Sequence, residues 1–123
     1  MDDKQRDHEN KIDQLQVQLK FVTEDRYNAE ASIHQFERNE EEAHSIFHGI
    51  QHLFHDIHET FQEGEMNVFI ADAHKEIEYK QQGFNYENEE KMELLQKEKR
   101  ELVDSEDDLY YKLRSLNQQG VIK

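Results

Sequence analysis

Five of the chain's eight histidines fall between residues 44 and 58, in the stretch HSIFHGIQHLFHDIH. Successive histidines are three or four residues apart, and this spacing places side chains on one face of a helix. Imidazoles four residues apart bind zinc or nickel readily, so adventitious metal binding is expected at His44, His48 and His52. A metal-binding protein is therefore one hypothesis, and a polar helix face in contact with water is the other.

The opposite side of the same predicted helix is apolar. At about 100° per residue, the histidines lie across the helix from Phe47, Ile50 and Phe54. A specific metal site needs ligands from several helices and neighbouring groups that orient each imidazole. The second half of the chain offers only His74. We therefore predict neither a physiological metal site nor a cofactor, and we interpret the histidines as a polar stripe.

No other set of residues has the pattern of a catalytic site. The chain has no cysteine, and its serines lie within helical patterns without the tight turn that a nucleophile needs. The 29 acidic residues supply many carboxylate pairs, which are typical of solvated helix faces. We therefore expect a protein without enzymatic activity.

A regular apolar pattern runs through the first half of the chain in alternating steps of three and four residues. Its positions are Ile12, Leu15, Leu19, Val22, Arg26, Ala29, Ile33, Phe36, Glu40, Ala43, Phe47, Ile50, Phe54, Ile57 and Phe61. Only Arg26 and Glu40 interrupt it, so the pattern predicts a helix over about residues 8–62 with a coiled-coil type of seam. The absence of proline favours long, unbroken helices.

A second helix is expected over about residues 66–117, after a turn near Gly64, because glycine commonly follows a helix C-terminus. Its apolar positions are Phe69, Ile70, Ala73, Ile77, Phe84, Met92, Leu94, Leu95, Leu102, Val103, Leu109, Tyr110, Leu113 and Leu116. If the chain folds back at Gly64, apolar residues of the two helices face each other in pairs. The two residue numbers of every pair add up to the same value. The pairs are Phe61–Ile70, Phe54–Ile77, Phe47–Phe84, Phe36–Leu95, Ala29–Leu102, Val22–Leu109 and Leu15–Leu116.

The same register accounts for both charged interruptions of the seam. It places Glu40 opposite Lys91, and Arg26 opposite Ser105 with Glu106 next to it. Opposite charges at seam positions can specify a register at some loss of stability. The predicted fold is therefore all-α: one domain of residues 1–123 that forms a long, antiparallel two-helix hairpin.

The charge of the chain excludes several classes of partner. A formal net charge of -14 argues against nucleic acid and anionic membranes, which require a basic face. No apolar run approaches the roughly 20 residues that span a bilayer, and the polar N-terminus is not a signal peptide. We expect synthesis as a soluble cytoplasmic protein and, if the chain is exported with a partner, export without a conventional signal.

The apolar stripe of the first helix is too wide for one neighbouring helix, because Ile46 and Leu53 flank the seam. A helical protein partner is therefore expected. The residues predicted to bind it are Ile46, Phe47, Ile50, Leu53, Phe54, Phe84, Leu94, Val103 and Tyr110. A self-associating coiled-coil scaffold, in which copies of the chain cover this surface, remains the alternative.

Residues 69–116, FIADAHKEIEYKQQGFNYENEEKMELLQKEKRELVDSEDDLYYKLRSL, resemble the small α-helical proteins encoded beside LXG toxins of the type VII (Esx) secretion system. The resemblance lies in the Phe/Ile pair at the N-terminal end of this segment, its Glu/Lys-rich centre and the sequence EDDLYYKLRSL at its C-terminal end. It implies a chaperone or targeting factor that binds the helical N-terminal domain of an LXG toxin. A second small helical accessory protein would be a further partner.

The related WXG-type hairpins carry Trp-x-Gly near the turn and Tyr-x-x-x-Asp/Glu on the second helix. This chain has no tryptophan, and its loose analogue, residues 47–49, falls inside the first helix. Tyr86 and Glu90 match the second motif, but in the middle of a helix. The resemblance therefore favours an accessory partner of a toxin over a chain that itself carries an export signal.

Overall fold

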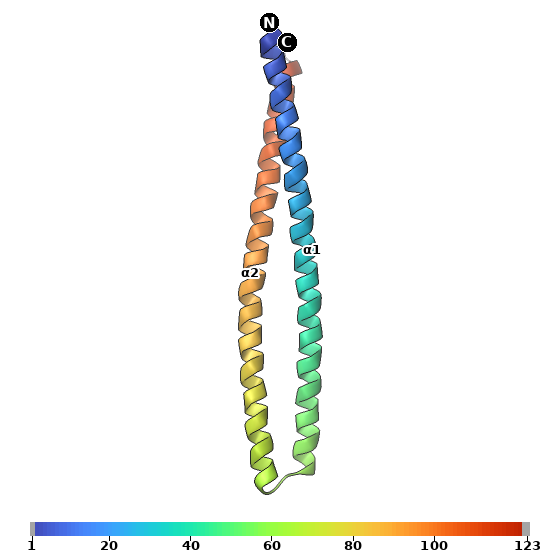
Figure 1. Ribbon diagram of the computed structural model, residues 1–123, viewed down its shortest axis with the longest axis vertical. Helices are drawn as coiled ribbons and strands as arrows, with labels where there is room; N and C mark the ends of the chain where they lie inside the picture. Colours follow the sequence, from blue (N-terminus) through green and yellow to red (C-terminus); the bar gives the residue numbers. More distant parts are fainter. Residues whose placement is uncertain (1, 122–123) are drawn as a thin grey trace. The chain divides into compact units, whose positions relative to one another are not determined.

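Two helices make up nearly the whole chain in the computed structural model. Helix α1 (Asp2–Thr60) and helix α2 (Glu65–Val121) run antiparallel and are joined by a short turn (Figure 1). The structure describes the backbone of residues 2–121 and the side chains of residues 3–119. A chain without proline can sustain helices of 59 and 57 residues. The predicted all-α helical hairpin is confirmed.

The turn consists of residues 61–64, at the position that the sequence predicted. The backbone N–H of Phe61 donates to the carbonyl of Ile57 (2.9 Å), and the Nδ2 group of Asn67 donates to the carbonyl of Gln62 (3.0 Å). Gly64 has a φ of 95°, in the left-handed region that a glycine adopts without steric penalty. This residue lets the chain leave α1 and enter α2 within four residues.

The seam of α1 follows the predicted pattern. Every position from Ile12 to Ile57 is buried or half-buried, including the charged Arg26 and Glu40. Ala29 and Ile33 are the most enclosed, with exposed fractions of 6% and 4%. Phe61 is 43% exposed, because α1 ends at Thr60 and Phe61 lies in the turn.

The seam of α2 departs from strict heptads at one place. Its inward residues are Ile70, His74, Ile77, Gln81, Phe84, Asn88, Met92, Leu95, Lys99, Leu102, Glu106, Leu109, Leu113 and Leu116. Two successive steps of four residues, at Asn88 and Met92, interrupt the alternation of three and four. After this stutter, every second inward position lies one residue later than strict heptads would place it, as at Met92, Lys99, Glu106 and Leu113.

The chain divides into two compact units, each containing parts of both helices. The turn unit comprises residues 34–94, and the end unit comprises the residues up to Ile33 together with those from Leu95 onward. In the turn unit, the rings of Phe47 and Phe84 lie 5.6 Å apart between centroids, as the predicted register requires. In the end unit, Val22 and Leu109 line one hollow, in the same register.

One predicted seam pair is wrong. The Oε1 atom of Glu40 lies 3.6 Å from Nε2 of His44 on its own helix, while Lys91 is exposed. No ion pair joins Glu40 to Lys91 in the described part of the chain. The stutter explains this difference, because it turns Met92 inward and Lys91 outward. The same shift places Glu106, and not Ser105, beside Arg26.

Neither helix, over its described residues, contains a stretch that is both long and apolar enough to cross a membrane.

Candidate partner-binding surface

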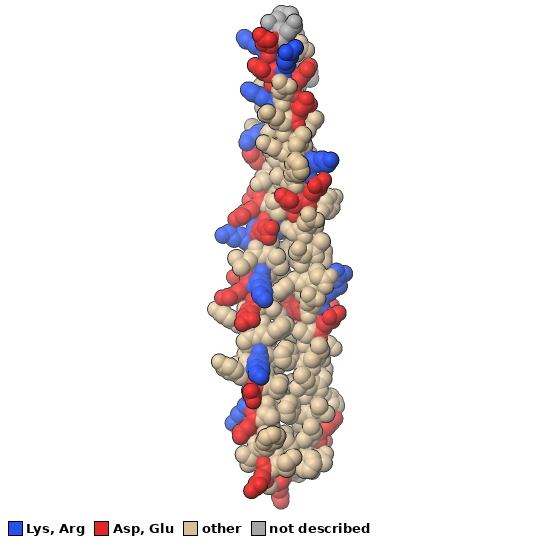
Figure 2. All heavy atoms as spheres, in the orientation of Figure 1, with Lys and Arg blue, Asp and Glu red and all other residues tan. Residues whose placement is uncertain are grey.

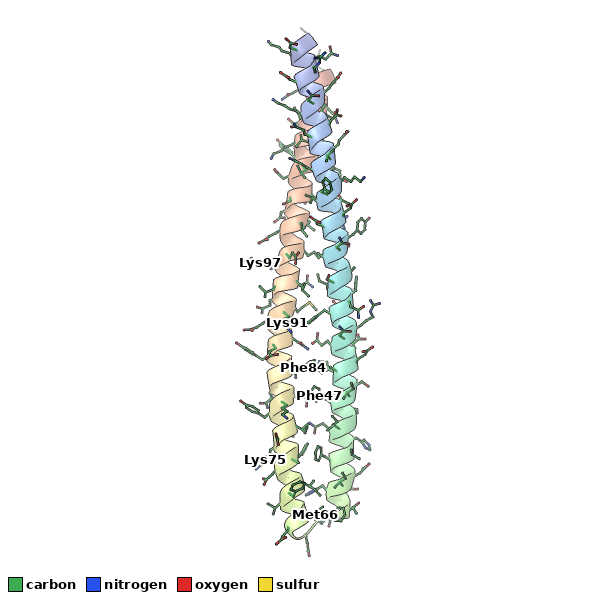
Figure 3. The ribbon with its side chains drawn as sticks, viewed as in Figure 1. Phe47, Met66, Lys75, Phe84, Lys91 and Lys97 are labelled. Carbon is green, nitrogen blue, oxygen red and sulfur yellow. The ribbon has the colours of Figure 1, made fainter. Side chains whose placement is uncertain are left out.

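Four of the predicted partner-binding residues lie in the seam of the turn unit. Phe47, Ile50, Phe54 and Phe84 are half-buried there, and Figure 3 shows Phe47 and Phe84 pointing toward one another. These side chains hold α1 against α2, so only their edges can reach a partner.

Ile46 and Leu53 lie beside the seam and not in it. Their exposed fractions are 63% and 57%. Gly49 lies between them, three residues after Ile46 and four before Leu53, so the three residues form one stripe along α1. A stripe with the same spacing runs along α2. Its residues are Met66, Phe69, Ala73, Glu76, Lys80, Gly83 and Glu87.

A hollow shows that these two stripes share one side of the hairpin. It has a volume of about 460 Å³ and lies beside the seam of the turn unit. Its lining residues are Gln51, Phe54, His55, His58, Ile70, Ala71, His74, Lys75 and Glu78. Because these residues occupy one side of the seam on both helices, the stripes through Ile46 and Phe69 border the other side. We call that other side the open flank, defined by Ile46, Gly49, Leu53, Met66, Phe69, Ala73 and Gly83.

The open flank is apolar and accessible. Met66 and Phe69 are 51% and 69% exposed, adding to Ile46 and Leu53 on α1. In Figure 2, uncharged side chains cover most of the visible surface of the turn unit, in the lower half of the view. Exposed apolar side chains gathered on one side of a protein commonly mark an interaction site.

Met66, Phe69 and the two glycines were not among the predicted binding residues. Phe69 was placed among the apolar positions of the second helix, yet the structure turns it outward. A signal was present in the sequence. Phe61, Met66, Val68 and Phe69 crowd around the turn, and a two-helix seam cannot bury all of them.

The histidine stripe reaches the hollow on the other side of the hairpin. His55 and His58 line this hollow, and His74 joins the two helices there. The ring of His74 stacks on Phe54 at 5.3 Å between centroids, and its Nε2 donates to Oε1 of Gln51 at 2.6 Å. Oε1 of Glu78 lies 3.4 Å from the same nitrogen. His74 therefore acts as a polar link within the seam.

The histidines predicted to bind metal adventitiously, His44, His48 and His52, are all exposed. His44 lies beside Glu40, and Nδ1 of His52 lies 3.3 Å from Asp56. Among the described residues, no group of three or more histidines and carboxylates is arranged to hold a metal ion. The stripe is thus a series of polar side chains that pair locally along α1.

The remaining predicted residues lie elsewhere on α2. Leu94 and Tyr86 have exposed fractions of 67% and 65%, and Glu90 is also exposed. Val103 and Tyr110 belong to the end unit. Val103 is half-buried in a hollow of about 280 Å³, and Tyr110 is 53% exposed.

A charged cluster joins the helices of the end unit. Nε of Arg26 and Oγ1 of Thr23 both donate to Oε2 of Glu106, each at 2.9 Å. Nη1 of Arg26 donates to Glu30, also at 2.9 Å. The hydrogen bond from Arg26 holds the pKa of Glu106 below its ordinary value, and the two carboxylates raise the pKa of Arg26. These hydrogen bonds join α1 to α2, so the cluster serves the packing of the hairpin.

The chain matches a known protein family. A family model described as "Protein of unknown function (DUF3958)" matches residues 10–116, which include most of both helices and the whole turn. No curated protein and no solved structure matches the chain.

Proposed function

The chain belongs to the DUF3958 family, and we propose that it is a non-enzymatic helical partner of a type VII-secreted LXG toxin. In this proposal it binds the toxin's helical N-terminal domain as a chaperone or targeting factor. The observation that carries the binding function is the open flank, where Ile46, Leu53 and Phe69 are each more than half exposed. The choice of a toxin as partner rests on the resemblance of residues 69–116.

The physical basis of binding is the burial of apolar surface. Removing apolar surface from water contributes roughly 25 cal/mol per Å². A hairpin of two helices leaves the borders of its seam open, and a helical bundle covers them. The open flank of the turn unit is such a border, because Ile46 and Leu53 on α1 and Met66 on α2 are exposed along it. We infer that the toxin domain adds helices to the hairpin there.

Co-expression with the N-terminal domain of a neighbouring LXG toxin tests this function. We expect the two chains to co-purify and to bind each other at micromolar concentrations or below. The absence of binding at micromolar concentrations, with both chains folded by circular dichroism, would refute the toxin as partner.

A second candidate function is a self-associating scaffold. It is favoured by the heptad seam of α1, which keeps one register from Ile12 to Ile57 and is typical of oligomeric coiled coils. Sedimentation equilibrium of the isolated chain separates the two functions. A stable dimer or tetramer favours the scaffold, whereas a monomer that gains thermal stability with the toxin domain favours the partner.

A further inference from the structure

The open flank has a distinct arrangement of charge. Its exposed charged neighbours in the same two stripes, with the α2 stripe followed past the stutter, are Glu42, Asp56, Glu76, Lys80, Glu87 and Lys91. Lys80 and Lys91 are the cations in this set, and Nζ of Lys80 lies 3.5 Å from Oε1 of Glu76, within the α2 stripe between Ala73 and Gly83. Outside this ion pair, the charged residues beside the apolar side chains are mainly carboxylates.

From this arrangement we propose that the open flank binds one amphipathic helix of a partner, whose apolar stripe is bordered by lysine and arginine. This inference rests on the proposed function and deepens it, because it names the docking face and the chemistry of the partner. Apolar residues of the incoming helix, spaced three, four and seven apart, lie over Ile46 and Leu53 of α1 and Phe69 of α2. Its basic residues meet Glu42, Asp56 and Glu87.

The glycines of the open flank set how closely that helix approaches. A Cβ atom added at Gly49 or Gly83 would meet nothing within 4 Å, so the hairpin itself does not require glycine there. Glycine within a helix is less stable than alanine by roughly 0.5–1 kcal/mol. The distance between packed helices depends on the side chains at the contact. Gly49 and Gly83 therefore mark where the partner helix comes nearest to the backbone.

The charge of the chain argues against a second copy at this site. Two open flanks facing each other would bring acidic borders together, and each chain carries a formal net charge of -14. Like charges opposed across an interface are unfavourable. A basic partner gains from the same borders, both in affinity and in the rate of association.

Two synthetic helical peptides of four heptads test the proposal on the full chain. Both carry the same leucine/alanine stripe, bordered by lysine in one peptide and by glutamate in the other. By fluorescence anisotropy, we expect the lysine-bordered peptide to bind and the glutamate-bordered peptide not to bind. Equal binding of both peptides, or of neither, would overturn the proposal.

A substitution on the open flank distinguishes binding of the peptide at this site from general electrostatic attraction to the acidic chain. Leu53→Asp adds a negative charge, which alone would strengthen binding of a basic peptide, but it also disrupts the apolar centre. We expect Leu53→Asp to weaken binding by about tenfold or more. Tyr79→Asp adds the same charge at a residue that is 77% exposed and faces away from the seam, and it should not weaken binding. Binding unaffected by Leu53→Asp would show that the peptide lies elsewhere.

Alanine at Gly49 and Gly83 tests the close approach. We expect each substitution to raise the melting temperature of the free chain and to weaken binding of the lysine-bordered peptide. Ser45→Ala, at an exposed position outside the open flank, is the matched control and should leave binding unchanged. Unchanged binding in both glycine variants would contradict the proposed approach.

Two further outcomes distinguish this inference from the proposed function. If the toxin domain binds and Leu53→Asp has no effect on its affinity, the docking face is wrong while the function stands. If the peptide binds at the open flank but no toxin domain binds, the toxin partner is wrong while the docking face stands. A dimer of the isolated chain that Leu53→Asp dissociates would assign the open flank to a second copy and overturn the inference.

Discussion

Nε of Arg26 lies 2.9 Å from Oε2 of Glu106, and this ion pair joins α1 to α2 across the seam of the end unit. The side chains of Arg26 and Glu106 are 20% and 13% exposed, so water reaches them only in part. Any shift of one helix along the other would separate these charges and leave each half-buried without its partner. The pair therefore favours the observed register over its neighbours.

The ion pair predicts a specific dependence of stability on pH. Arg26 lowers the pKa of Glu106 in the folded chain. The ion pair therefore contributes fully to the stability of the folded chain above the ordinary carboxyl pKa of about 4.3. This contribution is lost as the pH falls through the lower pKa that Glu106 has in the folded chain. Glu106→Gln should lower the melting temperature at pH 7, and the difference from the parent should shrink below about pH 4. Thermal unfolding followed by circular dichroism measures both.

Glu93→Gln provides the control for this experiment, because Glu93 is an exposed carboxylate on the same helix. It should change the melting temperature little at either pH. A Glu106→Gln deficit that is equal at pH 3 and pH 7 would contradict the stabilising role of the carboxylate.

The ring contact between Phe47 and Phe84 predicts an energetic coupling. Phe84→Ala should lower the free energy of unfolding by about 2 kcal/mol, below the range for fully buried phenylalanine because this ring is half-buried. A double-mutant cycle with Phe47→Leu and Phe84→Leu should show a coupling of about 0.5–1.5 kcal/mol. Urea denaturation gives both quantities, and additive effects of the two leucines would show that the rings do not interact.

Gly64 and Gly49 should respond to alanine with opposite signs. Gly64 has a φ of 95°, which costs an L-residue about 1–2 kcal/mol even though space for a Cβ is open. Gly64→Ala should therefore lower the melting temperature, whereas Gly49→Ala in mid-helix should raise it. Differential scanning calorimetry of the two variants suffices, and a shift in the same direction would disprove the conformational argument for the turn.

Asn88 is the buried polar residue at the stutter of α2, with an exposed fraction of 8%. Polar residues at core positions of coiled coils specify register at a loss of stability. Asn88→Leu should raise the free energy of unfolding by about 1 kcal/mol, because it places apolar surface in the seam. Glu89→Leu, at the exposed neighbouring position, should give no comparable gain. A destabilised Asn88→Leu variant would show that the amide supports the fold.

The sequence predicted the hairpin and most of its register, because an unbroken pattern from Ile12 to Ile57 determines which face of α1 is buried. It did not predict the pairing of Lys91. A heptad pattern places a seam residue every 3.5 residues on average, whereas an α-helix has 3.6 residues per turn, and a stutter relieves this difference. Nothing in the polar stretch around Asn88 marks where the stutter falls, so Lys91 was assigned an inward position that Met92 occupies.

The candidate surface was predictable only in part. Ile46 and Leu53 could be identified because they lie directly beside seam residues that the heptad pattern had predicted, and so widen the apolar stripe. The side of α2 on which Met66 and Phe69 lie could not be predicted, because the chain turns just before them. The geometry of that turn determines how the first turns of α2 are rotated about the helix axis. The histidines were expected to face water, and His55 and His58 are exposed, although both also line the hollow beside the seam.

The division of the chain into two units has a consequence for how the protein assembles during synthesis. The turn unit is built from the continuous segment 34–94, so its two helix halves can meet as soon as that segment has left the ribosome. The end unit joins segments from opposite ends of the chain, as in the contact between Arg26 and Glu106, which are 80 residues apart. Closing a longer loop costs more conformational entropy, and a turn unit already formed shortens it. Loop-closure entropy therefore favours zippering from the turn toward the termini, and the surface around Ile46 and Phe69 forms before the end unit closes.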